Sequence, residues 1–180
     1  LSLHDALPIW EERATGDGWA TRGRGLGDAW LRAKWNFSGD EASGPAWALL
    51  PYVKLPTADR DIGNRRGEPG CALVYGRPLR GERWCNGTLG FDSLDDGGGG
   101  RSVGTYASIA VGWPCAGGCT AYGEAVASMN TEATREWSGE LGLGVYREVG
   151  RGAVLDLAIY LGVTRAAPDV TPVLRLVWPL

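Results

Sequence analysis

Histidine, methionine and phenylalanine are scarce in this sequence of 180 residues, which contains one histidine, one methionine and two phenylalanines. The histidine, His4, lies close to the first residue, so catalysis by a serine nucleophile with a histidine base is not expected. Zinc sites use histidine and closely spaced cysteines, and none of the four cysteines forms a CxxC pair. We therefore expect no metal site and no cofactor, and we do not expect an enzyme.

A large charge of one sign and a long apolar run are also missing. The 18 basic and 21 acidic residues give a net charge of −3, which is too small to indicate a nucleic-acid partner. The longest uncharged stretch, residues 102–123, is interrupted by glycines and a proline and fits two strands better than one membrane helix. Residues 1–19 lack the basic start and apolar core of a signal peptide, so the leader of an exported protein would be missing or already removed.

The first residues look unlike the rest of the chain. Residues 1–9 resemble a peptide that arises when sequencing-adapter DNA is translated, and no expectation of fold is based on them. Residues 1–22 are therefore expected to be an irregular segment, and a foreign origin of this segment stays an open interpretation. Residues 23–180 are expected to form one domain.

Glycine and tryptophan, by contrast, are abundant, with 29 and 9 residues. Apolar and polar residues alternate in evenly spaced stretches, and charged residues keep to the polar positions. Ala29, Leu31 and Trp35, for example, would share one face of a strand, while Asp28 and Lys34 would share the other. The alternation predicts about nine strands, near residues 27–37, 46–55, 69–77, 84–92, 103–113, 120–129, 137–146, 153–164 and 171–179.

Strands with one apolar and one charged face predict an all-β fold, either an antiparallel transmembrane β-barrel or a soluble β-sandwich. The two longest connections, 56–67 and 93–102, belong to one alternating set, as do the long outer loops of membrane barrels. In that orientation, aromatic rings on the apolar faces lie near the strand ends, where a membrane interface favours them. They are Trp35, Trp47, Trp113 and Trp178 at the proposed periplasmic ends, and Phe91 and Trp137 at the proposed outer ends. This placement favours the transmembrane β-barrel.

The polar face supplies the residues that would line the lumen of such a barrel. They are Asp28, Arg32, Lys34, Tyr52, Lys54, Glu124, Glu140, Asp156, Tyr160 and Arg175. Both signs of charge are present, so strong ion selectivity is not expected. Two interpretations stay open, an open lumen or a closed one in which these residues pair with one another. Glu124 and Glu140 could serve as the acid and base of a glycosidase, but a wet lumen wall is the favoured interpretation.

The four cysteines give one candidate pair. Cys115 and Cys119 flank a Gly-Gly turn, so an oxidising compartment would permit a disulfide between them. Cys71 and Cys85 would lie nearly opposite each other across a hairpin, but a shift of one residue would separate them. The sequence therefore predicts a Cys115–Cys119 disulfide, with the other two cysteines as free thiols that face lipid.

Several motifs connect the chain to a known family. Residues 25–36 (GLGDAWLRAKWN), 48–58 (ALLPYVKLPTA) and 62–64 (IGN), and more loosely 122–124, 155–157 and 167–172, resemble the outer-membrane transporters of the MetA pathway of phenol degradation. The resemblance spans about residue 23 to the C-terminus. It implies an outer-membrane β-barrel of about a dozen strands, of which the nine seen here would be the C-terminal part of an N-terminally truncated barrel. One departure is that Pro179 and Leu180 follow Trp178, whereas barrels usually finish on an aromatic residue.

Taken with the resemblance, these patterns predict a bacterial outer-membrane β-barrel that passes small, aromatic or hydrophobic, solutes by passive diffusion. Its partners would be membrane lipid and a small-molecule solute, and the sequence leaves the oligomeric state open. Two alternatives also stay open. One is a structural or adhesion barrel with a filled lumen, and the other is a soluble ligand-binding β-barrel.

Overall fold

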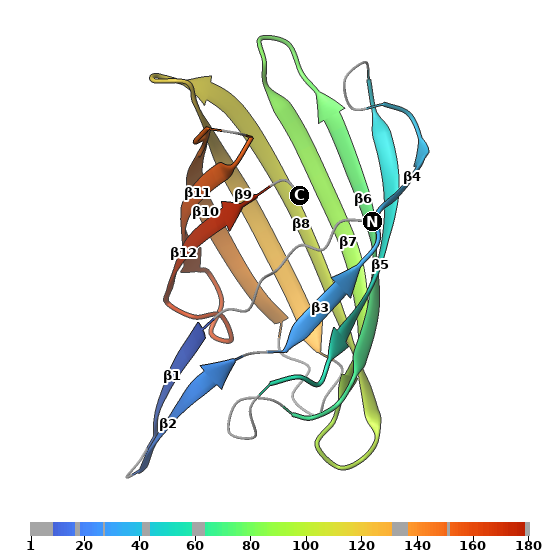
Figure 1. Ribbon diagram of the computed structural model, residues 1–180, viewed down its shortest axis with the longest axis vertical. Helices are drawn as coiled ribbons and strands as arrows, with labels where there is room; N and C mark the ends of the chain where they lie inside the picture. The colour runs from blue at the N-terminus through green and yellow to red at the C-terminus, as the bar shows by residue number, and fades with distance from the viewer. Residues whose placement is uncertain are drawn as a thin grey trace.

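The computed structural model describes residues 9–16, 19–26, 28–40, 44–58, 64–130, 137–150 and 152–178, with the backbone alone for those before residue 28 and for residue 130. Ten strands form one antiparallel sheet (Figure 1). Among the described residues, no helix is long and apolar enough to cross a membrane. The strands of the sheet are β3 (Ala29–Arg32), β4 (Trp35–Ser38), β5 (Ala46–Leu55), β6 (Glu68–Pro78), β7 (Trp84–Asp95), β8 (Arg101–Cys115), β9 (Cys119–Asn130), β10 (Trp137–Glu148), β11 (Val154–Gly162) and β12 (Val170–Val177).

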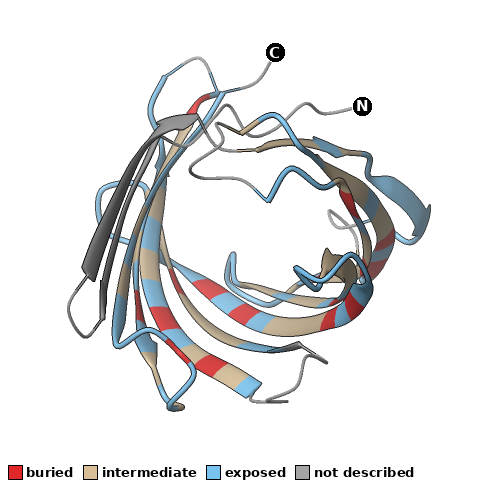
Figure 2. Cartoon of the chain, turned by 90° about the horizontal axis from the view of Figure 1, so that it is seen from below, coloured by how far each residue is buried: buried red, intermediate tan, exposed pale blue. Residues whose placement is uncertain are grey.

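The strands follow one another around the sheet in sequence order. From β5 to β12 each strand pairs antiparallel with the next, while β3 and β4 both pair with β5. The two edges are therefore β12 and the strands β3 and β4, and the sheet curves strongly between them, so that one of its faces is concave (Figure 2). The predicted all-β antiparallel fold is confirmed. The sheet is compatible with a β-barrel, although its two edges are not paired with each other among the described residues.

The strand predicted at 27–37 is in fact two strands, β3 and β4, separated by Ala33 and Lys34. The partner strand explains the break. The backbone nitrogen of Ala33 donates to the carbonyl oxygen of Pro51 at 3.0 Å, but Pro51 has no N–H to donate in return. One ladder hydrogen bond is thus missing where the strand is interrupted. The other eight predicted strands are all found, with ends that differ by up to three residues.

A separate hairpin precedes the sheet. Strand β1 (Ile9–Gly16) pairs antiparallel with β2 (Trp19–Leu26), and neither is paired with the larger sheet. No strand is expected here from the sequence once residues 1–9 are set aside, and the expectation was an irregular segment over 1–22. The signal that could have indicated the hairpin is the dipeptide Asp17-Gly18, which is typical of two-residue hairpin turns. Residues 1–8 lie outside the described residues.

The two faces of the sheet differ in chemistry. From β5 to β11 the registers pair odd-numbered residues with odd-numbered residues, so one face carries the odd positions throughout. Large apolar side chains on this face are exposed, and the exposed fraction of Leu143 is 65%. The face continues on β12, where Leu174 is 69% exposed. Further exposed members are Leu89, Ile109, Leu141, Leu157, Ile159, Leu161 and Leu176.

The even-numbered face is the concave one. The hydroxyl oxygens of Tyr52 on β5 and Tyr106 on β8 lie 3.0 Å apart. Three strand pairings separate β5 from β8, which in a flat sheet is a distance of about 14 Å. Contacts across three strand pairings recur on this face between Trp84 and Tyr146, and side chains on the inside of a curve are the ones brought together in this way. The exposed apolar face is therefore the convex face.

Aromatic rings on the concave face lie over glycines of neighbouring strands. A Cβ atom added at Gly142 would overlap the ring of Tyr160, which crosses β10 at that point. Glycine is needed there because any side chain would push the ring off the sheet. The ring and glycine pairs of this kind are Tyr52–Gly70, Trp84–Gly112, Tyr106–Gly90, Tyr122–Gly144 and Tyr160–Gly142.

Replacing Gly142 by alanine should lower the free energy of unfolding by about 1–3 kcal/mol, because the new methyl group overlaps the Tyr160 ring. Gly123→Ala on β9 is the matched control. Its methyl group would find Leu143 Cδ2 as the nearest atom at 3.7 Å, so alanine should be neutral or slightly stabilising there. Urea titrations followed by tryptophan fluorescence measure both values. Equal effects of the two substitutions would contradict the packing of the ring over glycine.

Candidate functional site

Most of the polar residues predicted for a lumen lie on the concave face. Asp28 directly precedes β3, and Lys34 lies in the interruption between β3 and β4, where it is exposed. The remaining residues occupy inward positions of the strands and come from both halves of the sheet. They are Arg32, Tyr52, Lys54, Glu124, Glu140, Asp156, Tyr160 and Arg175.

Two rows across the sheet repeat one arrangement of tyrosine, glycine and carboxylate. In each row the three residues are register partners on consecutive strands. The phenol lies over the glycine and its hydroxyl donates to the carboxylate two strands away, at 2.5 Å in the first row and 2.6 Å in the second. Each carboxylate therefore receives a short, charge-assisted hydrogen bond. The rows are Tyr52–Gly70–Asp92 and Tyr160–Gly142–Glu124.

An aromatic cluster extends the wall toward the β6–β7 turn. The ring centroids of Trp84, Tyr122 and Tyr146 lie 6.3 to 6.5 Å apart, and Trp84 Nε1 donates to the Tyr146 hydroxyl at 3.1 Å. The Tyr122 hydroxyl donates to Asp156 Oδ1 at 2.9 Å. The other carboxylate oxygen, Oδ2, lies 3.2 Å from Arg175 Nε on the edge strand β12. The cluster thus fixes one carboxylate and one guanidinium against a wall of rings.

A second guanidinium lies near the opposite edge of the sheet. The Arg32 guanidinium carbon is 5.3 Å from the centroid of the Trp30 ring and 5.9 Å from that of Tyr52. The two rings are 5.7 Å apart. Cations favour such positions because the ring face carries negative charge density. The concave wall therefore presents a guanidinium near each of its two edges, over rings for Arg32 and paired with Asp156 for Arg175.

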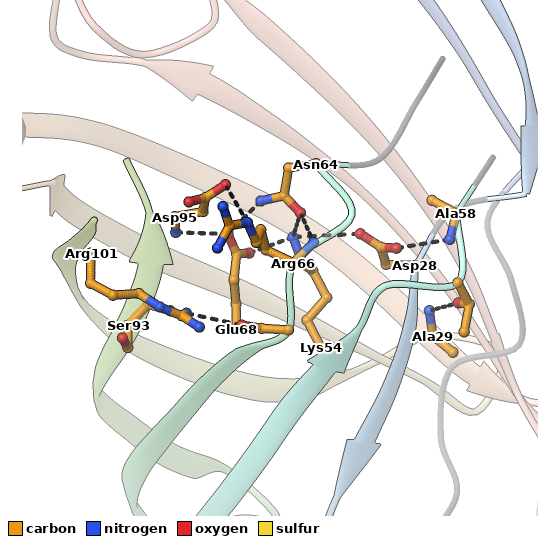
Figure 3. A network of polar contacts seen from close by, with 12 residues as sticks. Asp28, Ala29, Lys54, Ala58, Asn64, Arg66, Glu68, Ser93, Asp95 and Arg101 are labelled. Atoms are coloured by element: carbon orange, nitrogen blue, oxygen red, sulfur yellow. Dashed lines mark hydrogen bonds and ion pairs between the residues drawn. The ribbon is translucent and has the colours of Figure 1, made fainter. Parts of the chain in front are cut away.

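At one end of the sheet, ion pairs join three strand ends into what we call the rim network (Figure 3). Lys54 Nζ pairs with Glu68 and, at 3.4 Å, with Asp28, and the exposed fractions of these three side chains are only 9–12%. The same Nζ donates to Asn64 Oδ1 at 3.0 Å. Glu68 Oε1 accepts from Asn64 Nδ2 at 2.6 Å and from the backbone nitrogen of Asp95 at 3.0 Å. A nearly buried lysine is thus compensated by two carboxylates.

The rim network also ties the connecting loops to the wall. The backbone nitrogen of Ala58 donates to Asp28 Oδ1 at 2.8 Å. Arg101 Nη1 donates to the carbonyl oxygens of Gly67 at 2.9 Å and Ser93 at 3.1 Å (Figure 3). The connection between β5 and β6 is therefore fixed at Ala58 to the residue that precedes β3, and at Gly67 to the first residue of β8. This is the end of the sheet at which the longest predicted loops lie.

Glu124 and Glu140, which the sequence offers as an acid and base pair, do not face each other directly. Glu124 on β9 is the register partner of Gly142 on β10. Gly142 lies two residues after Glu140 on that strand. The Glu124 carboxylate accepts the hydrogen bond from Tyr160, while Glu140 lies opposite Gly162. The two carboxylates therefore belong to different rows of the wall.

Several concave-face residues are missing from the sequence prediction, namely Asp92, Trp84, Tyr106, Tyr122 and Tyr146. The aromatic members carry no charge, so alternation of charge does not assign them to a face. A signal was nevertheless present in the sequence. Most of these rings lie opposite a glycine on a neighbouring strand. A large ring that covers a glycine of the next strand is a known stabilising arrangement.

The aromatic residues predicted for a membrane interface are all exposed. Two of them have aromatic neighbours: Trp47 lies 4.8 Å from Tyr75 and Trp35 lies 5.9 Å from Phe37, measured between ring centroids. The five tryptophans lie within two residues of a strand end, whereas Phe91 lies four residues before the end of β7, which extends beyond the predicted strand. Their place at a membrane interface stays a prediction. The full set is Trp35, Trp47, Phe91, Trp113, Trp137 and Trp178.

The cysteines have different partners in the sheet. Cys115 and Cys119 are register partners at the turn between β8 and β9, and both are free thiols. The disulfide between them stays a prediction. Cys71 and Cys85 are not partners, since they pair with Phe91 and Arg77 respectively. Within the described part of the chain, no group of three or more histidine, cysteine or acidic residues is placed to hold a metal ion.

Comparison with known proteins identifies one family. The family described as "Putative MetA-pathway of phenol degradation" matches residues 1–90, which is half of the chain. The matched part contains β5 and β6, and with them Tyr52, Lys54 and Glu68 of the concave face. The comparison with curated proteins gave no match.

Lys54→Met should lower the free energy of unfolding by about 3 kcal/mol, because it leaves the carboxylates of Asp28 and Glu68 unpaired in a nearly buried site. Arg66→Gln is the control at the same end. The Arg66 side chain is 51% exposed and lies 3.8 Å from Asp95, so its loss should cost at most about 1 kcal/mol. Urea titration measures both. A cost for Lys54→Met no larger than that for Arg66→Gln would contradict the role of the rim network.

Proposed function

Because the chain belongs to the family of the MetA pathway of phenol degradation, we propose that it is a bacterial outer-membrane β-barrel protein that admits small, aromatic or apolar, solutes by passive diffusion. The observation that carries this proposal is the sidedness of the sheet. Apolar side chains are exposed on the convex face, and polar and aromatic groups gather on the concave face. We propose no reaction at the concave face, because the carboxylates of Asp92, Glu124 and Asp156 are held by phenols, and that of Asp156 also by Arg175.

The exposed convex face supports the membrane location. Large contiguous apolar patches are rare on monomeric soluble proteins. Leu143 and Leu174 are largely exposed, and no second sheet covers this face among the described elements. In a bilayer these side chains would face acyl chains, while the backbone groups stay paired within the sheet. The exposed tryptophans near the strand ends fit the two interfaces of such a bilayer.

The orientation follows from the rim network and the loops. Outer-membrane barrels have short periplasmic turns and longer outer loops. At the end where Lys54, Glu68 and Arg101 form the rim network, the connections after β5, β7, β9 and β11 have 12, 5, 6 and 7 residues. At the other end, the connections after β4, β6, β8 and β10 are shorter on the whole, with 7, 5, 3 and 5 residues. We therefore propose that the rim network faces the outside of the cell, and that the turn between β8 and β9 faces the periplasm.

A second candidate function is a structural or adhesion barrel whose lumen is filled. One observation favours it. Side chains three strand pairings apart touch across the concave face, as Tyr52 and Tyr106 do at 3.0 Å and Trp84 and Tyr146 at 3.1 Å. Contacts of this kind narrow the space inside a curved sheet. A measurement of whether small solutes pass through the protein distinguishes the filled barrel from the barrel that admits solutes.

Leu143→Arg should weaken folding into phosphatidylcholine vesicles by about 2–4 kcal/mol, because it places a charge on the proposed lipid face at mid-strand. Ser128→Arg on the concave face of β9 is the control and should fold as the parent does. Far-UV circular dichroism and sedimentation with the vesicles measure folding. If the protein were a soluble monomer, Leu143→Arg would be harmless on its exposed position, and that result would contradict the membrane location.

Vesicles that contain the folded protein should swell in isotonic arabinose faster than empty vesicles, because the wall offers a wet, polar path to a small solute. Stachyose, a much larger sugar, is the size control and should not cause swelling. Light scattering records both. Absence of any swelling above that of empty vesicles would eliminate passage and leave the filled barrel as the function.

A further inference from the structure

A cavity of about 500 Å³ lies on the concave face at the end opposite the rim network. Its size falls within the range of small-molecule sites. It is lined by two aromatic side chains, two valines and a proline, together with an amide, an ion pair and a further arginine, Arg77. The lining residues used below are Trp84, Asn86, Tyr146, Asp156 and Arg175.

The guanidinium of Arg175 is only partly engaged by the protein. Its Nε lies 3.2 Å from Asp156 Oδ2, while the side chain remains 55% exposed. The other oxygen of Asp156 already accepts from Tyr122 at 2.9 Å. The carboxylate is thus satisfied on both oxygens, and the arginine pairs with it through Nε rather than through its two Nη groups. These Nη groups are donors of the kind that bind a planar oxyanion.

The rings beside this guanidinium are held in fixed positions. Trp84 lies over Gly112 and donates from Nε1 to the Tyr146 hydroxyl at 3.1 Å. The two ring centroids are 6.5 Å apart. A ring that enters the cavity meets apolar and aromatic surface that need not rearrange, which lowers the entropic cost of binding.

We propose that this cavity binds a planar aromatic carboxylate, whose ring lies against Trp84 and Tyr146 and whose carboxylate accepts from the Arg175 Nη groups. The inference rests on the proposed function to the extent that solutes must reach the concave face. A cationic ligand is disfavoured because a guanidinium lines the cavity, and an aliphatic acid would forgo contact with the rings. The Asp156–Arg175 pair orients the guanidinium, so that Asp156 acts as a positioning residue.

The test uses 4-fluorobenzoate and the purified full chain in detergent micelles. Fluorine NMR should show broadening that saturates with ligand and that unlabelled benzoate reverses, beyond the effect of empty micelles. Arg175→Gln should weaken binding by roughly tenfold or more, since it removes hydrogen bonds to a charged group. Trp84→Leu should weaken it by about threefold to tenfold. Neutral 4-fluorobenzyl alcohol should bind the parent weakly and should not respond to Arg175→Gln.

Arg165→Gln is the matched control, because this arginine is exposed and lies in the connection between β11 and β12 at the other end of the sheet. It should leave the affinity for 4-fluorobenzoate unchanged. Circular dichroism confirms that each variant is folded, and Arg175→Lys, which keeps the charge, provides a second variant with an intermediate affinity. Absence of saturable binding by the folded parent, or equal affinities of the parent, Arg175→Gln and Trp84→Leu, would overturn the assignment.

The binding and swelling experiments together distinguish failure of this site from failure of the proposed function. Swelling of vesicles in arabinose without saturable binding of 4-fluorobenzoate would leave passage intact and remove the site. Saturable binding that Arg175→Gln weakens, without any swelling, would keep the site and remove passage. The cavity would then be a ligand site within a filled barrel.

Discussion

The contact between an aromatic ring and a glycine of the neighbouring strand is the constraint on which the concave face depends. Because Gly70 and Gly142 have no side chain, the phenols of Tyr52 and Tyr160 can lie against the sheet. Their hydroxyls then reach carboxylates two strands away. An upright ring would leave those carboxylates without a donor in a partly buried wall. Part of the high glycine content therefore follows from the polar chemistry of the wall, and not only from turns.

Two kinds of polar contact divide the concave face along its length. At the rim network, full charges compensate one another around Lys54, and the contacts reach into the loops. Further along, neutral phenols satisfy single carboxylates, and arginines lie beside rings near the two edges. The first kind fixes the connections at one end of the sheet, and the second kind places phenols, carboxylates and guanidinium groups side by side on the concave wall.

The strands and their facing sides could be predicted from the sequence because the period of two is a local property. Tyr52 and Lys54 fall on the polar side of β5 by simple alternation, and the same holds for Glu124 on β9. What depends on a neighbouring strand could not be predicted in this way. The break between β3 and β4 is caused by Pro51 on the partner strand, and Trp84 is directed by the glycine that it covers on β8. Both require the register between strands, which the sequence of one strand does not contain.

The order and direction of the strands restrict how the two edges of the sheet could pair. Eight antiparallel steps lead from β3 to β12, so the two edge strands run in the same direction. A ring in which every neighbour is antiparallel must therefore gain an odd number of strands between these edges. The hairpin of β1 and β2 supplies an even number and cannot complete such a ring alone. A second copy in the same orientation could not do so either, because its β3 would lie parallel to β12 of the first.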